Sequence, residues 1–143
     1  MKKSKKNIKN IEIIFYTLLT VFVLLLLYFV VPTEVSTKRA LFPAAAVLVI
    51  AFFIFGILLT VFVFKSKIKG KLKIYLLLTG FSAIGFLVFV LLHNFIYGFF
   101  IYLFGENFWR GGDEAFFLIL AVIVCPILFL VGVVGSLVLL LKK

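Results

Sequence analysis

A few polar side chains in the second half of the chain could carry chemistry. His93 is the only histidine, and a histidine can bind a metal or haem or relay protons near neutral pH. Carboxylates follow in the segment before the last apolar run, where they could hold a cation or a positively charged lipid headgroup. The candidate polar site is therefore made of His93, Asn94, Tyr97, Glu106, Arg110, Asp113 and Glu114.

A purely structural interpretation explains the same residues. One histidine per chain cannot supply both axial haem ligands unless a second copy or another subunit provides the other, and His93 could instead hydrogen-bond to Tyr97 or to a loop carboxylate. Asp113 is expected to cap the helix that follows, and Glu114 places negative charge at the positive end of its dipole. Arg110 is expected to pair with Asp113 or Glu106. We expect no metal and no cofactor.

Several motifs of known enzymes and transporters are incomplete here. Residues 111–115 resemble the GGDEF signature of diguanylate cyclases, but that chemistry needs a soluble nucleotide-binding domain. Cys125 is the only cysteine, which excludes a disulfide relay. Glu12 lies at the edge of the first apolar run, whereas a small multidrug transporter needs an acid deep inside it. No phosphate-binding loop, HExxH motif or serine elbow occurs. We therefore predict that the chain is not an enzyme.

The composition requires a membrane protein. Of the 143 residues, 66% are hydrophobic and only 14% are charged, whereas soluble domains are about 45–50% apolar and about 25% charged. Four continuous apolar runs, at about residues 11–31, 41–64, 72–94 and 115–141, are each long enough to cross a bilayer as a helix. The predicted fold is all-α: one domain over residues 1–143 with four transmembrane helices.

The ends of these runs give more specific expectations. Pro32 ends the first run, and Pro43 falls in the first turn of the second, where a missing N–H is harmless. The third run stays apolar to Phe104, which is too long for one perpendicular span. We expect a bend near residues 94–98, followed by an aromatic segment along the outer interface; the alternative is one strongly tilted helix.

Basic residues predict the orientation. Twelve of the fifteen lysines and arginines lie at the two ends of the chain or between the second and third runs. Since cytoplasmic segments carry the excess of basic residues, both termini are predicted to be cytoplasmic, in a multi-pass cell-membrane protein. These lysines would attract anionic lipid headgroups, at about 1 kcal/mol each. Their distribution beside apolar spans argues against nucleic-acid binding.

The fourth run carries a stripe of small residues that predicts close helix packing. Gly132 and Ser136 form a small-xxx-small pair beside Gly135, which lets two backbones approach closely. The stripe is expected to meet the third span or a partner subunit. Pro126 removes a helical hydrogen bond, so a kink is expected near residues 122–126.

Short motifs in the C-terminal third carry a family resemblance. They are His93-Asn94, Gly112-Asp113-Glu114-Ala115-Phe116-Phe117, Cys125-Pro126, Phe129-Leu130-Val131-Gly132 and Gly135-Ser136. With these motifs the chain resembles a group of small, uncharacterised prokaryotic four-span membrane proteins. The resemblance implies that His93-Asn94 and the Gly-Asp-Glu loop act as a unit, and it implies no activity.

Three functions are compatible with the sequence. The first is a non-enzymatic membrane subunit that acts as a scaffold, as an accessory to a larger membrane protein, or as a homo-oligomer. The second is a minimal homo-oligomeric channel or transporter, although intramembrane polar groups that such proteins use are few here. The third is a redox subunit that binds a cofactor through His93.

Overall fold

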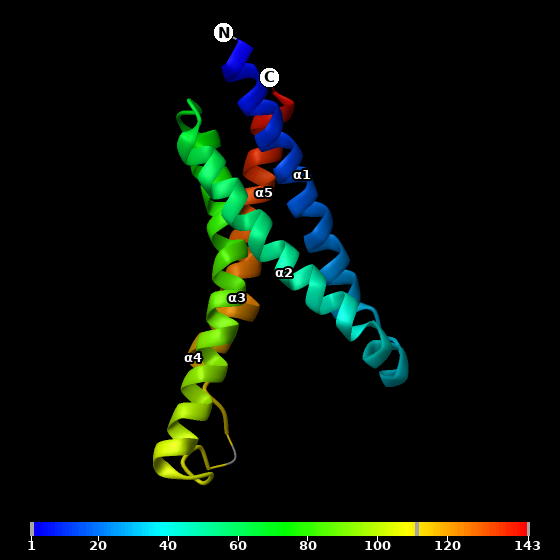
Figure 1. Ribbon diagram of the computed structural model, residues 1–143, viewed down its shortest axis with the longest axis vertical. Helices are drawn as coiled ribbons and strands as arrows, with labels where there is room; N and C mark the ends of the chain where they lie inside the picture. Colours follow the sequence, from blue (N-terminus) through cyan, green and yellow to red (C-terminus); the bar gives the residue numbers. More distant parts are fainter. Residues whose placement is uncertain (1, 111, 143) are drawn as a thin grey trace.

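A computed structural model describes residues 2–110 and 112–142, and this part of the chain is helical apart from short connections (Figure 1). The helices are α1 (Lys2–Val30), α2 (Val35–Lys65) and α3 (Lys71–Phe104), followed by α4 (Ala115–Ile119), the π-helical turn η1 (Leu120–Val124) and α5 (Cys125–Leu141). Since α4, η1 and α5 are continuous, the structure has four helices long and apolar enough to cross a membrane. The predicted all-α class with four spans is confirmed.

The helices form two arms that diverge along the long axis of the molecule. α3 packs against both α2 and α5, while α1 packs mainly along α2. Figure 1 shows α1 and α2 separating from α3 and α4 toward the end that carries the α1–α2 turn and the α3–α4 loop. The start of α1, the end of α5 and the α2–α3 loop lie at the opposite end, which we call the basic end (Figure 1).

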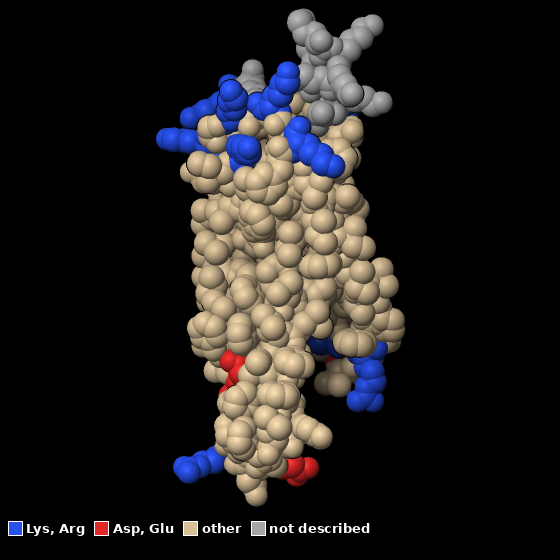
Figure 2. All heavy atoms as spheres, turned by 60° about the vertical axis from the view of Figure 1, so that its left-hand side comes forward, with Lys and Arg blue, Asp and Glu red and all other residues tan. Residues whose placement is uncertain are grey.

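Charged side chains are segregated along the same axis. Lys65, Lys67, Lys69 and Lys71 are exposed at the basic end, and Figure 2 shows basic side chains gathered there above a broad uncharged band. This distribution is consistent with an apolar belt bounded by polar ends. That the basic end is cytoplasmic stays a prediction from the sequence.

The core contains one face of α1 and a cluster of aromatic rings. The buried side chains of α1 recur at spacings of three and four residues and are Ile11, Phe15, Leu18, Val21 and Leu25. Phe22 from α1 packs against Phe129 from α5 with ring centroids 4.4 Å apart, and Phe52 from α2 lies 5.1 Å from the same ring. This cluster joins the two arms near their point of divergence, through van der Waals contact of the kind that stabilises membrane bundles.

Small residues bring α5 and α3 into close contact. A Cβ added to Gly132 would lie 2.8 Å from the backbone nitrogen of Thr79, and one added to Gly135 would lie 2.5 Å from the ring of Tyr75. Ser136 is fully buried, and its hydroxyl has no hydrogen-bond partner among the described residues. The stripe predicted from the sequence therefore lies against the third span of the same chain, and Gly132 and Gly135 are not free for a partner subunit.

α2 begins earlier than the apolar run that predicts it. The helix starts at Val35 after the cap residue Glu34, so Pro43 lies inside the helix rather than in its first turn. Because proline has no N–H, the carbonyl of Arg39 lacks its helical donor. The polar segment 36–39 is helical although hydropathy places it outside the span.

α3 does not bend after His93. It continues without interruption to Phe104, so the expected break near residues 94–98 is wrong and residues 95–104 extend the third helix. Its 34 residues correspond to about 51 Å at 1.5 Å per residue, whereas the hydrocarbon core of a bilayer is about 30 Å thick. Along the molecular axis this end of α3 extends beyond the α1–α2 turn (Figure 1).

The irregularity expected before Pro126 takes the form of a π-helical turn. Cys125 donates its N–H to the carbonyl of Leu120, five residues earlier, in place of the usual four. Proline cannot donate to the preceding turn, and a π-turn is one of the known ways in which a helix accommodates such an interruption.

Candidate polar site at the end of α3

The centre of the candidate site is a contact between His93 on α3 and Glu114 at the start of α4. Nδ1 of His93 lies 2.7 Å from the backbone carbonyl oxygen of Glu114 and 3.2 Å from its Oε2. Because a carbonyl oxygen can only accept, Nδ1 is the donor and carries a proton. Both side chains are largely buried, with 12% and 8% exposure. This contact anchors the last span to α3.

Glu114 also caps its own helix. Its Oε1 accepts hydrogen bonds from the backbone N–H groups of Phe116 at 2.8 Å and Phe117 at 3.2 Å. The cap was expected at Asp113, and that assignment is wrong: Asp113 Oδ1 instead accepts from the N–H of Glu114 at 2.7 Å. The longer side chain of Glu114 reaches the free N–H groups of the first turn, which are otherwise unsatisfied. A negative charge at this helix end is also favoured by the dipole.

Asp113 completes an acidic environment around the imidazole. Its Oδ2 lies 3.6 Å from Nε2 of His93, with the Asp113 side chain half exposed. The two ring nitrogens of His93 therefore each face a carboxylate. The imidazole thus links α3 to the start of the last span through both of its nitrogens.

Aromatic side chains extend the site away from the bundle. The ring of Tyr97 stacks on His93 with centroids 6.4 Å apart and on Trp109 at 5.9 Å. Trp109 donates its indole N–H to the backbone carbonyl of Tyr97 at 3.3 Å, which folds the loop back onto α3. Phe100 also contacts Trp109, at 5.8 Å between centroids. We call residues 95–110 the aromatic lobe.

Three of the predicted site residues lie outside this contact. Asn94 is exposed and donates to the carbonyl of Val90 in its own helix at 2.8 Å. Glu106 and Arg110 are exposed at the tip of the loop, and within the described residues neither forms an ion pair, so the expected pairing of Arg110 with Asp113 or Glu106 is wrong. Arg110 has a positive φ of 48°, in the left-handed region that non-glycine residues adopt rarely.

The structure thus joins His93, Tyr97, Asp113 and Glu114, and separates Asn94, Glu106 and Arg110 from them. Within residues 2–110 and 112–142 no three His, Cys, Asp or Glu side chains are grouped to hold a metal ion. Sequence reasoning did not include Trp109 in the site, although its place in the aromatic run after His93 was visible. Its indole bond to Tyr97 has no signal in the sequence.

The chain was compared with known proteins in three ways. No family model, no curated protein and no solved structure was found to match it. The resemblance to small prokaryotic four-span membrane proteins therefore stays a prediction.

Proposed function

We propose that the chain is a non-enzymatic integral membrane protein that serves as a scaffold or accessory subunit and binds a larger membrane protein or a second copy through the aromatic lobe. The observation that carries this proposal is the exposed apolar face of the lobe. Tyr102 is 85% exposed and Phe104 60% exposed, at the end of a helix that extends past the α1–α2 turn (Figure 1).

The lobe is folded on one side and open on the other. Its inner side is held by the Trp109 indole bond to Tyr97 and by the packing of Phe100, Phe104 and Phe108, whose centroids are 5.0–5.7 Å apart. Its outer side presents Tyr102 and Leu103, which are 85% and 52% exposed. A rigid aromatic surface of this kind is typical of protein interfaces, where Tyr, Trp and Phe are enriched.

The polar groups of the spans support a structural rather than a transport role. Five hydroxyls in the spans donate to the carbonyl four residues earlier in their own helix, and they belong to Thr17, Thr20, Thr60, Thr79 and Ser82. Each of these hydroxyls uses its proton within its own helix, whereas transport sites use intramembrane polar or ionisable groups. We place the protein in the cell membrane, with the basic end cytoplasmic and in contact with anionic headgroups.

The test is the mass and composition of the intact particle, purified from native membranes in mild detergent. We expect a stoichiometric partner or a homo-oligomer for the wild type, and loss of that association for the double variant Tyr102→Ser, Leu103→Ser. The control is Val35→Ser, which removes a 74% exposed apolar side chain at the α1–α2 turn and should leave the particle unchanged. A wild-type monomer, or equal association of the lobe variant and the wild type, would refute the proposal.

A further inference from the structure

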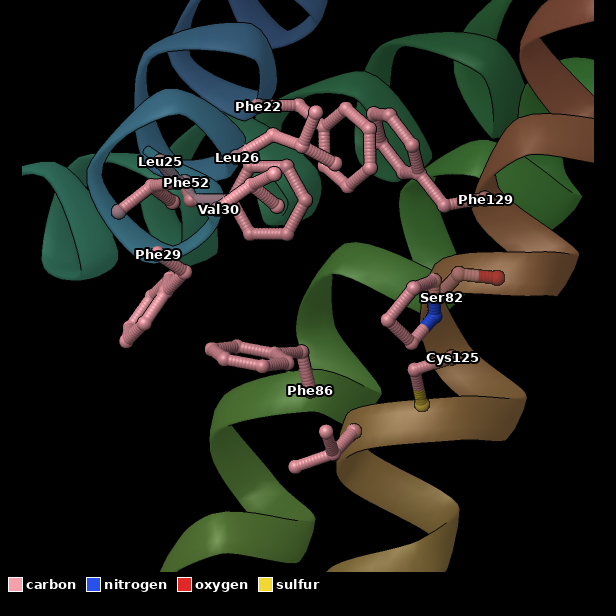
Figure 3. A pocket seen from close by; sticks show the side chains of 12 residues that line it. Phe22, Leu25, Leu26, Phe29, Val30, Phe52, Ser82, Phe86, Cys125 and Phe129 are labelled. Carbon is pink, nitrogen blue, oxygen red and sulfur yellow. The ribbon is translucent and has the colours of Figure 1, made fainter. Parts of the chain in front are cut away.

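The two arms enclose a cavity on the side where they separate. The cavity has a volume of about 330 Å³ and lies between the second half of α1 and the seam of α3, η1 and α5. Figure 3 shows Phe29 from α1 and Phe86 from α3 extending into it from opposite sides, with Cys125 and Ser82 on the far wall. Phe52 and Phe129 close it toward the basic end.

The local structure of η1 and α5 shapes one wall. The π-turn ends at Val124, so the small side chain of Cys125 and the ring of Pro126 face the cavity where a regular helix with larger residues would fill it. π-turns occur frequently at functional sites. The opposite wall comes from Leu25, Leu26 and Val30 of α1.

The cavity lies at hydrocarbon depth. Ser82 and Phe86 follow Lys71, the first residue of α3, by about 16 and 22 Å along the helix at 1.5 Å per residue. The hydrocarbon core is about 30 Å thick, so the cavity extends from its middle toward the lobe. Its edge is open, because Phe29 is 60% exposed, Val30 68% and Val122 54%. Lipid tails therefore surround this opening.

The chemistry of the lining excludes water as the occupant. A buried water needs two to four polar partners, but the lining is apolar except for Ser82 and Cys125, and the Ser82 hydroxyl already donates to the carbonyl of Leu78 at 2.7 Å. A volume of about 330 Å³ is in the range of small-molecule pockets.

We propose that this cavity binds one hydrocarbon chain of a bilayer lipid, which enters between α1 and η1 and lies against Phe86 and Cys125. This site is separate from the aromatic lobe and does not depend on the proposed subunit function. A bound chain would fill the space between the arms and fix the angle at which they diverge.

The first test compares two neighbouring substitutions on η1. Val122 lines the cavity and is 54% exposed, whereas Ile123 is 53% exposed and does not line it. Native mass spectrometry of the full chain, purified in mild detergent, should find one lipid retained per chain for the wild type and for Ile123→Phe. Val122→Phe fills the opening, and its lipid occupancy should fall at least fivefold. Equal retention by Val122→Phe and wild type, or a lipid-free dimer of the wild type, would overturn the proposal.

A second measurement does not require the filled variant to fold. In a Trp109→Phe background, Phe86→Trp places the only tryptophan in the cavity, and Phe81→Trp, at a position 52% exposed on the surface of α3, serves as the control. In vesicles of phosphatidylcholine with brominated chains, we expect bromine to quench both tryptophans to the same degree. Quenching at least twofold weaker at position 86 would mean that no chain enters, and the proposal would be wrong.

Discussion

Replacing Gly132 by alanine should push α5 away from α3. The added Cβ would lie 2.8 Å from the backbone nitrogen of Thr79 and 2.9 Å from the carbonyl oxygen of Tyr75. Both atoms belong to the backbone of α3, so no side-chain rotation relieves the contact. The helices would have to separate by about 0.6 Å to restore an ordinary contact of 3.4 Å. Overpacking of this kind costs about 1–3 kcal/mol.

The chain provides a matched control for this substitution. Gly98 is also in α3, and a Cβ added there meets nothing within 4 Å. Alanine gains about 1 kcal/mol over glycine from helix propensity at either position, so that contribution cancels when the two variants are compared. Gly132→Ala should therefore be less stable than Gly98→Ala by about 1–3 kcal/mol, the whole overpacking cost.

The assay is reversible unfolding of each variant in mixed detergent micelles, followed by circular dichroism, with the wild type alongside. We expect Gly98→Ala to be as stable as the wild type or more stable, and Gly132→Ala to unfold at lower denaturing detergent. If the two variants have the same midpoint, the helices are not in contact at Gly132. The assignment of the small-residue stripe to packing within the chain would then be wrong.

Two further predictions concern the polar site and the middle of the membrane. Glu114→Ala removes the helix cap and the 3.2 Å contact of the carboxylate with His93, and it leaves the contact with the backbone carbonyl in place. It should lower the free energy of unfolding by about 1–2 kcal/mol, whereas Glu106→Ala, at an exposed loop position, should leave it unchanged. Similar midpoints for the two variants would contradict the role of Glu114. Cys125, the only cysteine, lines an apolar cavity and should not react with a charged, membrane-impermeant thiol reagent added to either side of intact vesicles, because the thiolate that reacts needs water to form. The same reagent should react once the protein is unfolded. Rapid modification in intact vesicles would favour a water-filled channel.

The number of helices could be predicted because continuous apolar runs have few alternatives in a bilayer. The ends of the helices could not be predicted, because hydropathy reports where the hydrocarbon lies and not where the helix stops. Residues 36–39 are polar yet helical, and residues 95–104 are aromatic yet continue α3. In both places the helix extends past the apolar core.

The polar site was predictable in part for a different reason. His93 and Glu114 are 21 residues apart. His93 lies on the third predicted helix, and the acidic residues that signal a cap lie at the start of the fourth. The sequence therefore indicates that the histidine and a carboxylate can meet. It does not indicate which carboxylate, because that depends on how the loop returns. The loop returns with Trp109 against Tyr97, which leaves Arg110 at the tip and brings Glu114 rather than Glu106 to the imidazole.

α3 connects the polar site and the cavity mechanically. Ser82 and Phe86 line the cavity, and seven residues beyond Phe86 the same helix holds His93, which anchors the carbonyl of Glu114 at 2.7 Å. Between Glu114 and the cavity lie only α4 and the π-turn. Because α4, the π-turn and α5 follow one another without a break, the His93–Glu114 contact lies at the start of the helix that carries Val122 and Cys125. We therefore expect that loosening this contact would change the cavity without altering any residue that lines it.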